Sequence, residues 1–156
     1  MILLPALVLS VLMIITHTYL GLHVLARGVI FVDLALAQVA ALAPLKGKPV
    51  IAYHSSFLYL ADAFGLHIVD HVEPVSGITP GAAHLQKLVA RIKTEQVGLL
   101  IMEPYYERRS ASYLAEQTGI KVAVLPQSVG STPEIVTYFD LFDGIVAALQ
   151  KSGVLK

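Results

Sequence analysis

The first 45 residues of the chain are almost continuously apolar. Residues 2–22 carry no charge and only scattered polar side chains, which matches the roughly 20 residues that a helix needs to cross a bilayer. A second apolar stretch, residues 28–45, is interrupted by Asp33 and Gln38 and has a marginal length for a span. The pattern predicts a transmembrane helix over the first stretch. Over the second it predicts a transmembrane helix, an interfacial helix or a helix that packs inside a larger bundle.

Charged residues are rare before Lys46 and frequent after it. The chain contains 11 Lys and Arg residues and 11 Asp and Glu residues, and only Arg27 and Asp33 precede Lys46. The first stretch also lacks the basic start and the small-residue cleavage pattern of a secretory signal peptide, so we expect it to be retained. We therefore divide the chain into a hydrophobic membrane segment, residues 1–44, and a polar lobe, residues 45–156.

From Lys46 onward, short β-prone runs alternate with amphipathic helical patterns. The runs are mostly continuous in hydrophobicity, as buried parallel strands are. They comprise Val50–Tyr53, Leu66–His71, Leu99–Met102 and Val122–Leu125. The alternation predicts an α/β fold, with one Rossmann-like lobe in which helices flank a mainly parallel four-stranded sheet.

The helical patterns between these runs have defined faces and ends. Apolar side chains recur at helical spacing between residues 82 and 95, namely Leu85, Leu88, Val89 and Ile92. The pairs Thr79-Pro80 and Thr132-Pro133 each predict an N-cap followed by proline, and Gly119 suits a helix end. The last helix is expected from about residue 133 to residue 150. Its apolar side would consist of Ile135, Tyr138, Phe139, Phe142, Val146 and Leu149.

Composition and motifs exclude several kinds of site. There is no cysteine, so disulfides, thiolate metal sites and thiol nucleophiles are excluded. The formal net charge is zero, which gives no reason to expect a nucleic-acid partner. Neither a glycine-rich phosphate loop nor a GxSxG or HExxH motif occurs. We therefore expect no enzyme activity, and any metal ion would be held by histidine and carboxylate.

Among the six histidines, His54 has the most distinctive position. It follows the first predicted strand and precedes an aromatic-rich helical pattern, and α/β sheets bind ligands where strands end and helices begin. Imidazole is a common zinc ligand, but the residues alone leave open a buried histidine satisfied by a hydrogen bond. His67 and His71 would point the same way along one strand, about 13 Å apart, too far to share an ion. His84 is expected to be solvated on its helix.

Four ordered blocks resemble the C-terminal lobe of the metal substrate-binding proteins of zinc- and manganese-type ABC importers. They cover about residues 45–150 and read "PLKGKPVIAYHSSFLYLADAFGL", "EPVSGITPGAAHLQKLVARIK", "GLLIMEPYYERRSASYLAEQTGIKVAVL" and "YFDLFDGIVAAL". The resemblance implies that His54 is the metal ligand of this lobe and that Glu103 is structural. The first lobe of the family, which supplies other ligands, has no counterpart here. Thr137 stands where manganese-type members carry a late aspartate.

The membrane segment resembles a different component of the same importers. The sequence "YLGLHVLARGVIFVDLALAQVAAL" is similar to the segment that follows the first helix of the integral permease. Arg27 and Asp33 fit that pattern, and Gln38 stands where histidine is more usual. The resemblance covers about residues 1–43 and implies the start of a permease joined to the end of its own binding protein.

Together these observations predict a non-enzymatic, membrane-anchored component of a zinc- or manganese-type ABC uptake system, truncated or fused. It would bind a divalent metal ion weakly through His54, with zinc as the first candidate and manganese as the second. Its partners would be the ABC permease and ATPase subunits. It would lie in the cytoplasmic membrane, with the polar lobe facing the periplasm or the cell exterior.

Three alternatives remain open from the sequence. The first is a membrane-tethered interaction module that binds no metal. The second is a non-functional gene-fusion remnant. The third is an α/β enzyme in which His54 acts as a general base with Glu103 or Asp62 nearby.

Overall fold

The computed structural model describes residues 10–15, 40–75 and 77–155. The chain divides into two compact units, Met1–Ala37 and Gln38–Lys156. In the first unit, residues 10–15 are helical. The two expected membrane stretches lie largely outside the described residues, so their spanning the membrane stays a prediction. Within the described ranges, no helix combines the length and the apolar character needed to cross a bilayer.

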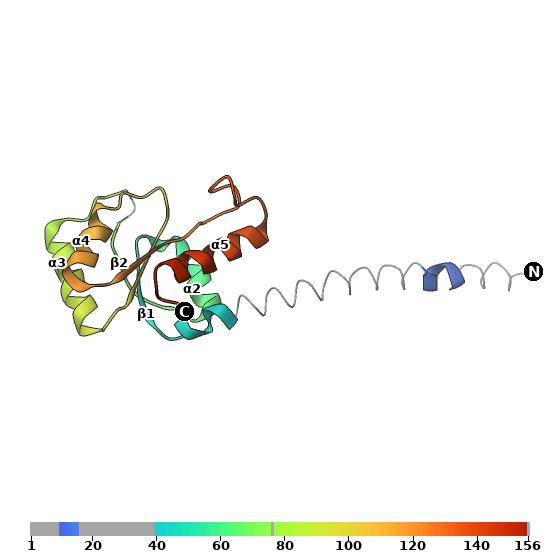
Figure 1. Ribbon diagram of the computed structural model, residues 1–156, viewed down its shortest axis with the longest axis horizontal. Helices are drawn as coiled ribbons and strands as arrows, with labels where there is room; N and C mark the ends of the chain where they lie inside the picture. The colour runs from blue at the N-terminus through green and yellow to red at the C-terminus, as the bar shows by residue number, and fades with distance from the viewer. Residues whose placement is uncertain (1–9, 16–39, 76, 156) are drawn as a thin grey trace, which may run out of the picture. The chain divides into compact units, whose positions relative to one another are not determined.

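A four-stranded parallel sheet lies at the centre of the second unit (Figure 1). Its strands are β1 (Pro49–Ala52), β2 (His67–His71), β3 (Leu99–Met102) and β4 (Lys121–Val124). Their spatial order is β2-β1-β3-β4, and every neighbouring pair is parallel. This confirms the predicted α/β class and places each strand within one residue of its predicted ends.

Helices cover both faces of the sheet (Figure 1). On one face lie α3 (Ala82–Thr94) and α4 (Arg109–Thr118). On the other lie the short 3-10 helices η1 (Ala43–Leu45) and η2 (Ser55–Phe57), together with α2 (Leu58–Phe64) and α5 (Tyr138–Lys151). The polar lobe is therefore a three-layer sandwich with two separate apolar cores.

Alternation along the strands divides the apolar side chains between these cores. In β1, Val50 and Ala52 belong to the core under α2 and α5, whereas Ile51 belongs to the core under α3 and α4. In β3, Leu99 and Ile101 belong to the core under α2 and α5. Leu100 and Met102 belong to the core under α3 and α4. Because successive side chains of a strand point to opposite faces, a run that is apolar at every position is needed to fill both cores.

Two helices begin later than the sequence predicted. The N-cap of α3 is Gly81 and not Thr79, and the N-cap of α5 is Thr137 and not Thr132. At α5 a capping box forms, in which the Asp140 N–H donates to Thr137 Oγ1 at 3.2 Å and the Thr137 N–H donates to Asp140 Oδ2 at 2.6 Å. Such a box satisfies two backbone donors at once, which favours this start over a single threonine cap.

The later start also changes which face of α5 is buried. Its buried side chains are Leu141, Ile145 and Leu149, spaced by four residues, whereas Tyr138 is 64% exposed. Of the predicted apolar side, Ile135 and Leu149 are buried and Val146 packs against the same core, whereas the prediction is wrong for Tyr138. The prediction for Gly119 is confirmed, because it ends α4 with a positive φ of 74°, which glycine adopts without a steric cost.

Candidate metal centre

The carboxyl ends of the parallel strands bring three titratable side chains to one edge of the sheet. His54 follows β1, Glu73 follows β2 and Glu103 follows β3. Backbone bonds continue beyond the strands: the Tyr53 N–H donates to the Ile101 carbonyl at 2.8 Å, and the Glu73 N–H donates to the Tyr53 carbonyl at 2.9 Å. The backbone next to His54 is thereby fixed from both neighbouring strands.

His54 occupies the corner that the sequence predicted. Its backbone is extended, with φ −135° and ψ 177°, and it directly precedes η2. Its Nδ1 lies 3.7 Å from Glu73 Oε2, and the two side chains are 20% and 10% exposed. That separation is too long for a hydrogen bond. A partly exposed imidazole thus stands beside a carboxylate, and its role as a metal ligand stays a prediction.

Several buried polar atoms at this edge have no hydrogen-bond partner within the described residues. They are His71 Nε2, Glu73 Oε2 and both carboxylate oxygens of Glu103. Glu103 is fully buried, and neither of its carboxylate oxygens accepts a hydrogen bond from a described residue. Leaving a buried polar atom unpaired is costly, so such atoms are uncommon and concentrate at functional positions.

Three tyrosines adjoin these acidic and histidine side chains. Tyr53 stacks on Tyr106 with ring centroids 4.8 Å apart, Tyr105 lies 4.9 Å from Tyr106, and the His54 ring meets Tyr106 edge-on at 6.1 Å. Burial raises the pKa of Tyr106, and the negative charge of Glu103 raises it further. The phenol therefore stays protonated at neutral pH, which leaves histidine and carboxylate as the metal-binding groups at this edge.

The remaining histidines take different positions. His67 begins β2 and His71 ends it, so they do not form a pair, as predicted. Burial lowers the pKa of His71, with the nearby His54 adding to this and Asp70 opposing it. The prediction for His84 is wrong: its Nε2 lies 3.0 Å from the His71 carbonyl oxygen, and its side chain is half-buried. The first turn of α3 packs against the end of β2, which brings this side chain out of solvent.

The number of donors is smaller than a metal site normally needs. Within the described ranges, no group of three or more His, Cys, Asp and Glu residues is arranged to hold an ion. Zinc sites use three or four protein ligands. Histidine nitrogens and carboxylate oxygens are both common zinc ligands. The chemistry of His54 and Glu73 thus fits zinc, and their number is half of a full tetrahedral set.

An apolar groove of about 420 Å³ lies between α2 and α5, and its lining begins at Ser56 in η2. Its lining is aromatic and aliphatic, including Tyr59, Phe64, Tyr138 and Phe142. None of its lining residues is a histidine or a carboxylate. The groove therefore contributes no carboxylate and no second imidazole to pair with His54.

Comparison with known sequences relates most of the chain to bacterial zinc uptake. The family model described as "Zinc-uptake complex component A periplasmic" matches residues 32–152. The high-affinity zinc uptake system protein ZnuA of Brucella abortus is 29% identical over 94 residues, covering 60% of this chain and 28% of that protein. ZnuA of Bacillus subtilis is 31% identical over 117 residues, covering 70% and 35%. The chain thus spans about a third of the length of these relatives.

Several solved structures resemble the lobe in fold. The substrate-binding protein FpvC of Pseudomonas aeruginosa, in complex with Ni²⁺, matches with a TM-score of 0.61 and 26% identity, covering 82% of this chain and 50% of that chain. FpvC in complex with Mn²⁺ matches with a TM-score of 0.56, also at 26% identity. The laminin-binding adhesin of Streptococcus agalactiae, at 21% identity and a TM-score of 0.57, shares the fold. The sequence match begins at residue 32, inside the segment that resembles a permease.

Proposed function

Because the chain belongs to the family of periplasmic zinc-uptake component A proteins, we propose that its polar lobe binds a divalent metal ion, zinc first, through His54. The family consists of solute-binding proteins and not enzymes, so a general-base role for His54 is set aside. The observation that carries the proposal is the position of this imidazole, partly exposed at the carboxyl end of β1 beside the Glu73 carboxylate.

Donor chemistry favours zinc over manganese. Imidazole is a preferred zinc ligand, whereas manganese favours carboxylate, carbonyl and water oxygens. Thr137, which stands where manganese-type members carry an aspartate, caps α5 and donates its hydroxyl to Asp140 Oδ2 at 2.7 Å. It adds no carboxylate near His54. The Ni²⁺ and Mn²⁺ complexes of FpvC keep both ions as further candidates for the metal.

We further propose that the chain is a component of an ABC uptake system, with a permease and an ATPase as partners. The family's role in zinc uptake supports this assignment. The apolar stretches of residues 1–44 would hold the chain at the cytoplasmic membrane, with the lobe in the periplasm or outside the cell. A fusion rests only on the resemblance of residues 1–43 to the start of a permease, and the zinc-uptake family model also matches the last part of that segment, from residue 32. Weak binding is proposed because two donors, His54 and Glu73, lie together among the described residues.

Calorimetric titration of the full chain with zinc, purified in a mild detergent, tests the ligand. We expect His54→Ala to lower the zinc affinity by at least about tenfold, because an imidazole donor is removed. His67→Ala is the matched control, since His67 is an exposed histidine at the opposite end of β2, and its affinity should equal that of the wild type. Tight binding that survives His54→Ala would refute the assignment.

A second candidate function is a membrane-tethered interaction module that binds no metal. It is favoured by the apolar groove between α2 and α5, whose rim includes the exposed side chains of Tyr59 and Tyr138. A zinc titration with no heat change, together with retained co-purification of a permease, would support this function in place of metal binding.

A further inference from the structure

The imidazole of His54 has two ring nitrogens, and Nδ1 is the one that the structure places beside the Glu73 carboxylate. We propose that Glu73 is a positioning residue, which accepts a hydrogen bond from His54 Nδ1–H and leaves Nε2 to bind the metal ion. The inference rests on the proposed function and deepens it, because it names the atom that contacts the ion and the residue that orients it.

The spacing of the two groups is close to that of a hydrogen bond. His54 Nδ1 and Glu73 Oε2 lie 3.7 Å apart, whereas the two heavy atoms of an N–H···O bond are about 2.7–3.2 Å apart. A movement of less than about 1 Å, which a small rotation of either side chain supplies, closes the gap. Nε2 lies on the other edge of the ring, so this bond leaves its lone pair available to an ion.

Burial suits Glu73 to accepting a bond from His54 more than to contacting an ion. Its Oε2 is buried and has no hydrogen-bond partner among the described residues, and its side chain is 10% exposed against 20% for His54. A buried oxygen without a partner is costly, and an ionised carboxylate can only accept, so the ring nitrogen beside it is favoured in its protonated form. The imidazole is the more accessible of the two groups to an ion that arrives from solvent.

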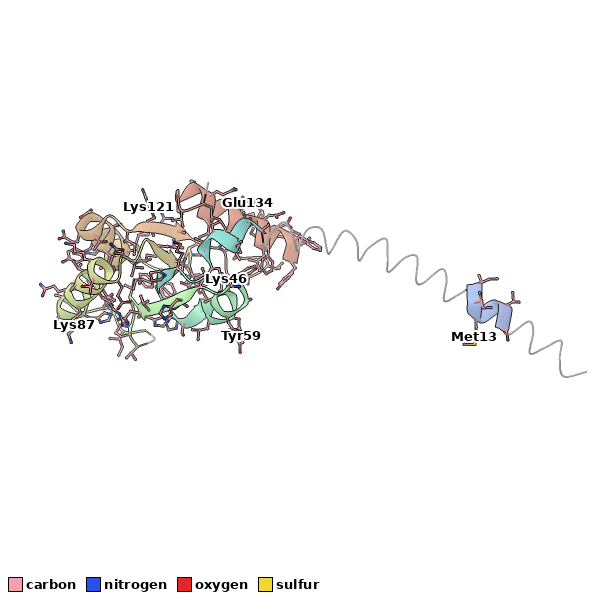
Figure 2. The ribbon with its side chains drawn as sticks, turned by 90° about the horizontal axis from the view of Figure 1, so that it is seen from below. Met13, Lys46, Tyr59, Lys87, Lys121 and Glu134 are labelled. Atoms are coloured by element: carbon pink, nitrogen blue, oxygen red, sulfur yellow. The ribbon has the colours of Figure 1, made fainter. Side chains whose placement is uncertain are left out.

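Neighbouring groups hold the two side chains in this relation. The Glu73 N–H donates to the Tyr53 carbonyl at 2.9 Å, which ties Glu73 to the residue before His54. Tyr53 stacks on Tyr106, and the Tyr106 ring meets the imidazole edge-on at 6.1 Å. The pair lies at the carboxyl edge of the sheet, opposite to Lys121, which begins β4 and is labelled in Figure 2. One strand pairing and one aromatic ring therefore restrict how the imidazole can turn.

An orienting carboxylate has a chemical consequence for the ring. Neutral imidazole carries one proton, and free histidine in water favours the tautomer with that proton on Nε2. A metal-binding histidine commonly donates its other N–H to a carboxylate, which fixes the tautomer and makes the ligand nitrogen more basic. Glu73 therefore reverses the ordinary preference and presents Nε2 of His54 without a proton, as an ion requires.

Nitrogen NMR of the isotope-labelled, metal-free full chain in a mild detergent tests the tautomer. Spectra are recorded at mildly alkaline pH, where free imidazole is neutral, and the His54 ring signals are those lost in His54→Ala. We expect the wild type to carry the His54 proton on Nδ1. In Glu73→Gln this tautomer should lose population, because the amide that replaces the carboxylate can donate to the ring nitrogen as well as accept from it.

Glu116→Gln is the matched control, because it makes the same chemical change at an exposed position of α4. It should keep the wild-type tautomer. Circular dichroism should show that each variant is folded.

Addition of zinc to the same samples identifies the nitrogen that binds. We expect the Nε2 signal of His54 to shift while Nδ1 keeps its proton. Loss of an orienting partner typically weakens metal binding by about 10–100-fold, so calorimetry should show a zinc affinity reduced by that factor in Glu73→Gln and unchanged in Glu116→Gln.

The outcomes separate this inference from the proposed function. A wild-type proton on Nε2, zinc bound through Nδ1, or a tautomer that is the same in Glu73→Gln and the wild type would overturn the positioning role and leave His54 as the ligand. Absence of zinc binding in the wild type would overturn both.

Discussion

The imidazole of His54 and the carboxylate of Glu73 come from the ends of neighbouring strands, and His54 Nδ1 lies 3.7 Å from Glu73 Oε2. The position of His54 was predictable because an apolar run ends one residue before it and a helical pattern follows. Glu73 was not singled out, since its proximity to His54 depends on the pairing of β1 with β2, which strand patterns do not specify. The environment of Glu103 could not be predicted either. Its burial without a hydrogen-bond partner among the described residues arises only when the lobe packs.

Glu103 offers a test at the residue scale. Its negative charge contributes to the raised pKa of Tyr105 and of Tyr106, after burial, because a nearby carboxylate disfavours the phenolate form. Glu103→Gln removes that charge. We expect the alkaline titration of these tyrosines, followed by phenolate absorbance, to move to lower pH.

Glu116→Gln provides the matched control, because Glu116 is exposed on α4 and makes no contribution to the raised pKa of either tyrosine. It should leave the phenolate titration unchanged. A titration curve that is identical in Glu103→Gln and in the wild type would show that the carboxylate does not act on the rings.

At the scale of elements, the four strands were the most predictable features and the helix starts the least. β1 and β3 were recognisable because they fill two cores and are apolar at every position, whereas β2 carries polar residues at three of its five positions, His67, Asp70 and His71. The residue at which a helix starts depends on which nearby threonine forms a reciprocal capping box. Thr132 and Thr137 are equally plausible as single caps, and only Thr137 has an acidic residue three positions later. The capping-box pattern was thus present in the sequence and was overlooked in favour of a Thr-Pro pair.

The capping box of α5 can be tested by substitution. Thr137→Ala removes the hydroxyl that accepts from the Asp140 N–H, so we expect the free energy of unfolding to fall by about 1 kcal/mol. Denaturant-induced unfolding of the full chain measures the change.

Thr79→Ala is the control, because Thr79 is exposed and α3 is capped by Gly81 instead. Its free energy of unfolding should stay within about 0.5 kcal/mol of the wild type. If the free energy of unfolding fell equally in Thr137→Ala and Thr79→Ala, the reciprocal cap would not stabilise α5.

At the scale of the whole molecule, ordered blocks were more informative than any single motif. The family relation rests on strand, helix and loop segments recurring in one order, and the match over residues 32–152 agrees with that resemblance. The number of metal ligands could not be obtained in this way, because ligands come from separate segments that only folding or association brings together. Spanning of the membrane by the apolar stretches stays a prediction from hydropathy.

The most direct test of metal binding by His54 is X-ray absorption at the zinc edge on the full chain loaded with half an equivalent of zinc. We predict a nitrogen and oxygen shell at about 2.0–2.2 Å, together with the outer-shell scattering that is characteristic of imidazole. In His54→Ala prepared in the same way, the imidazole scattering should disappear. An unchanged spectrum in that variant, or a wild-type spectrum without imidazole, would contradict the account.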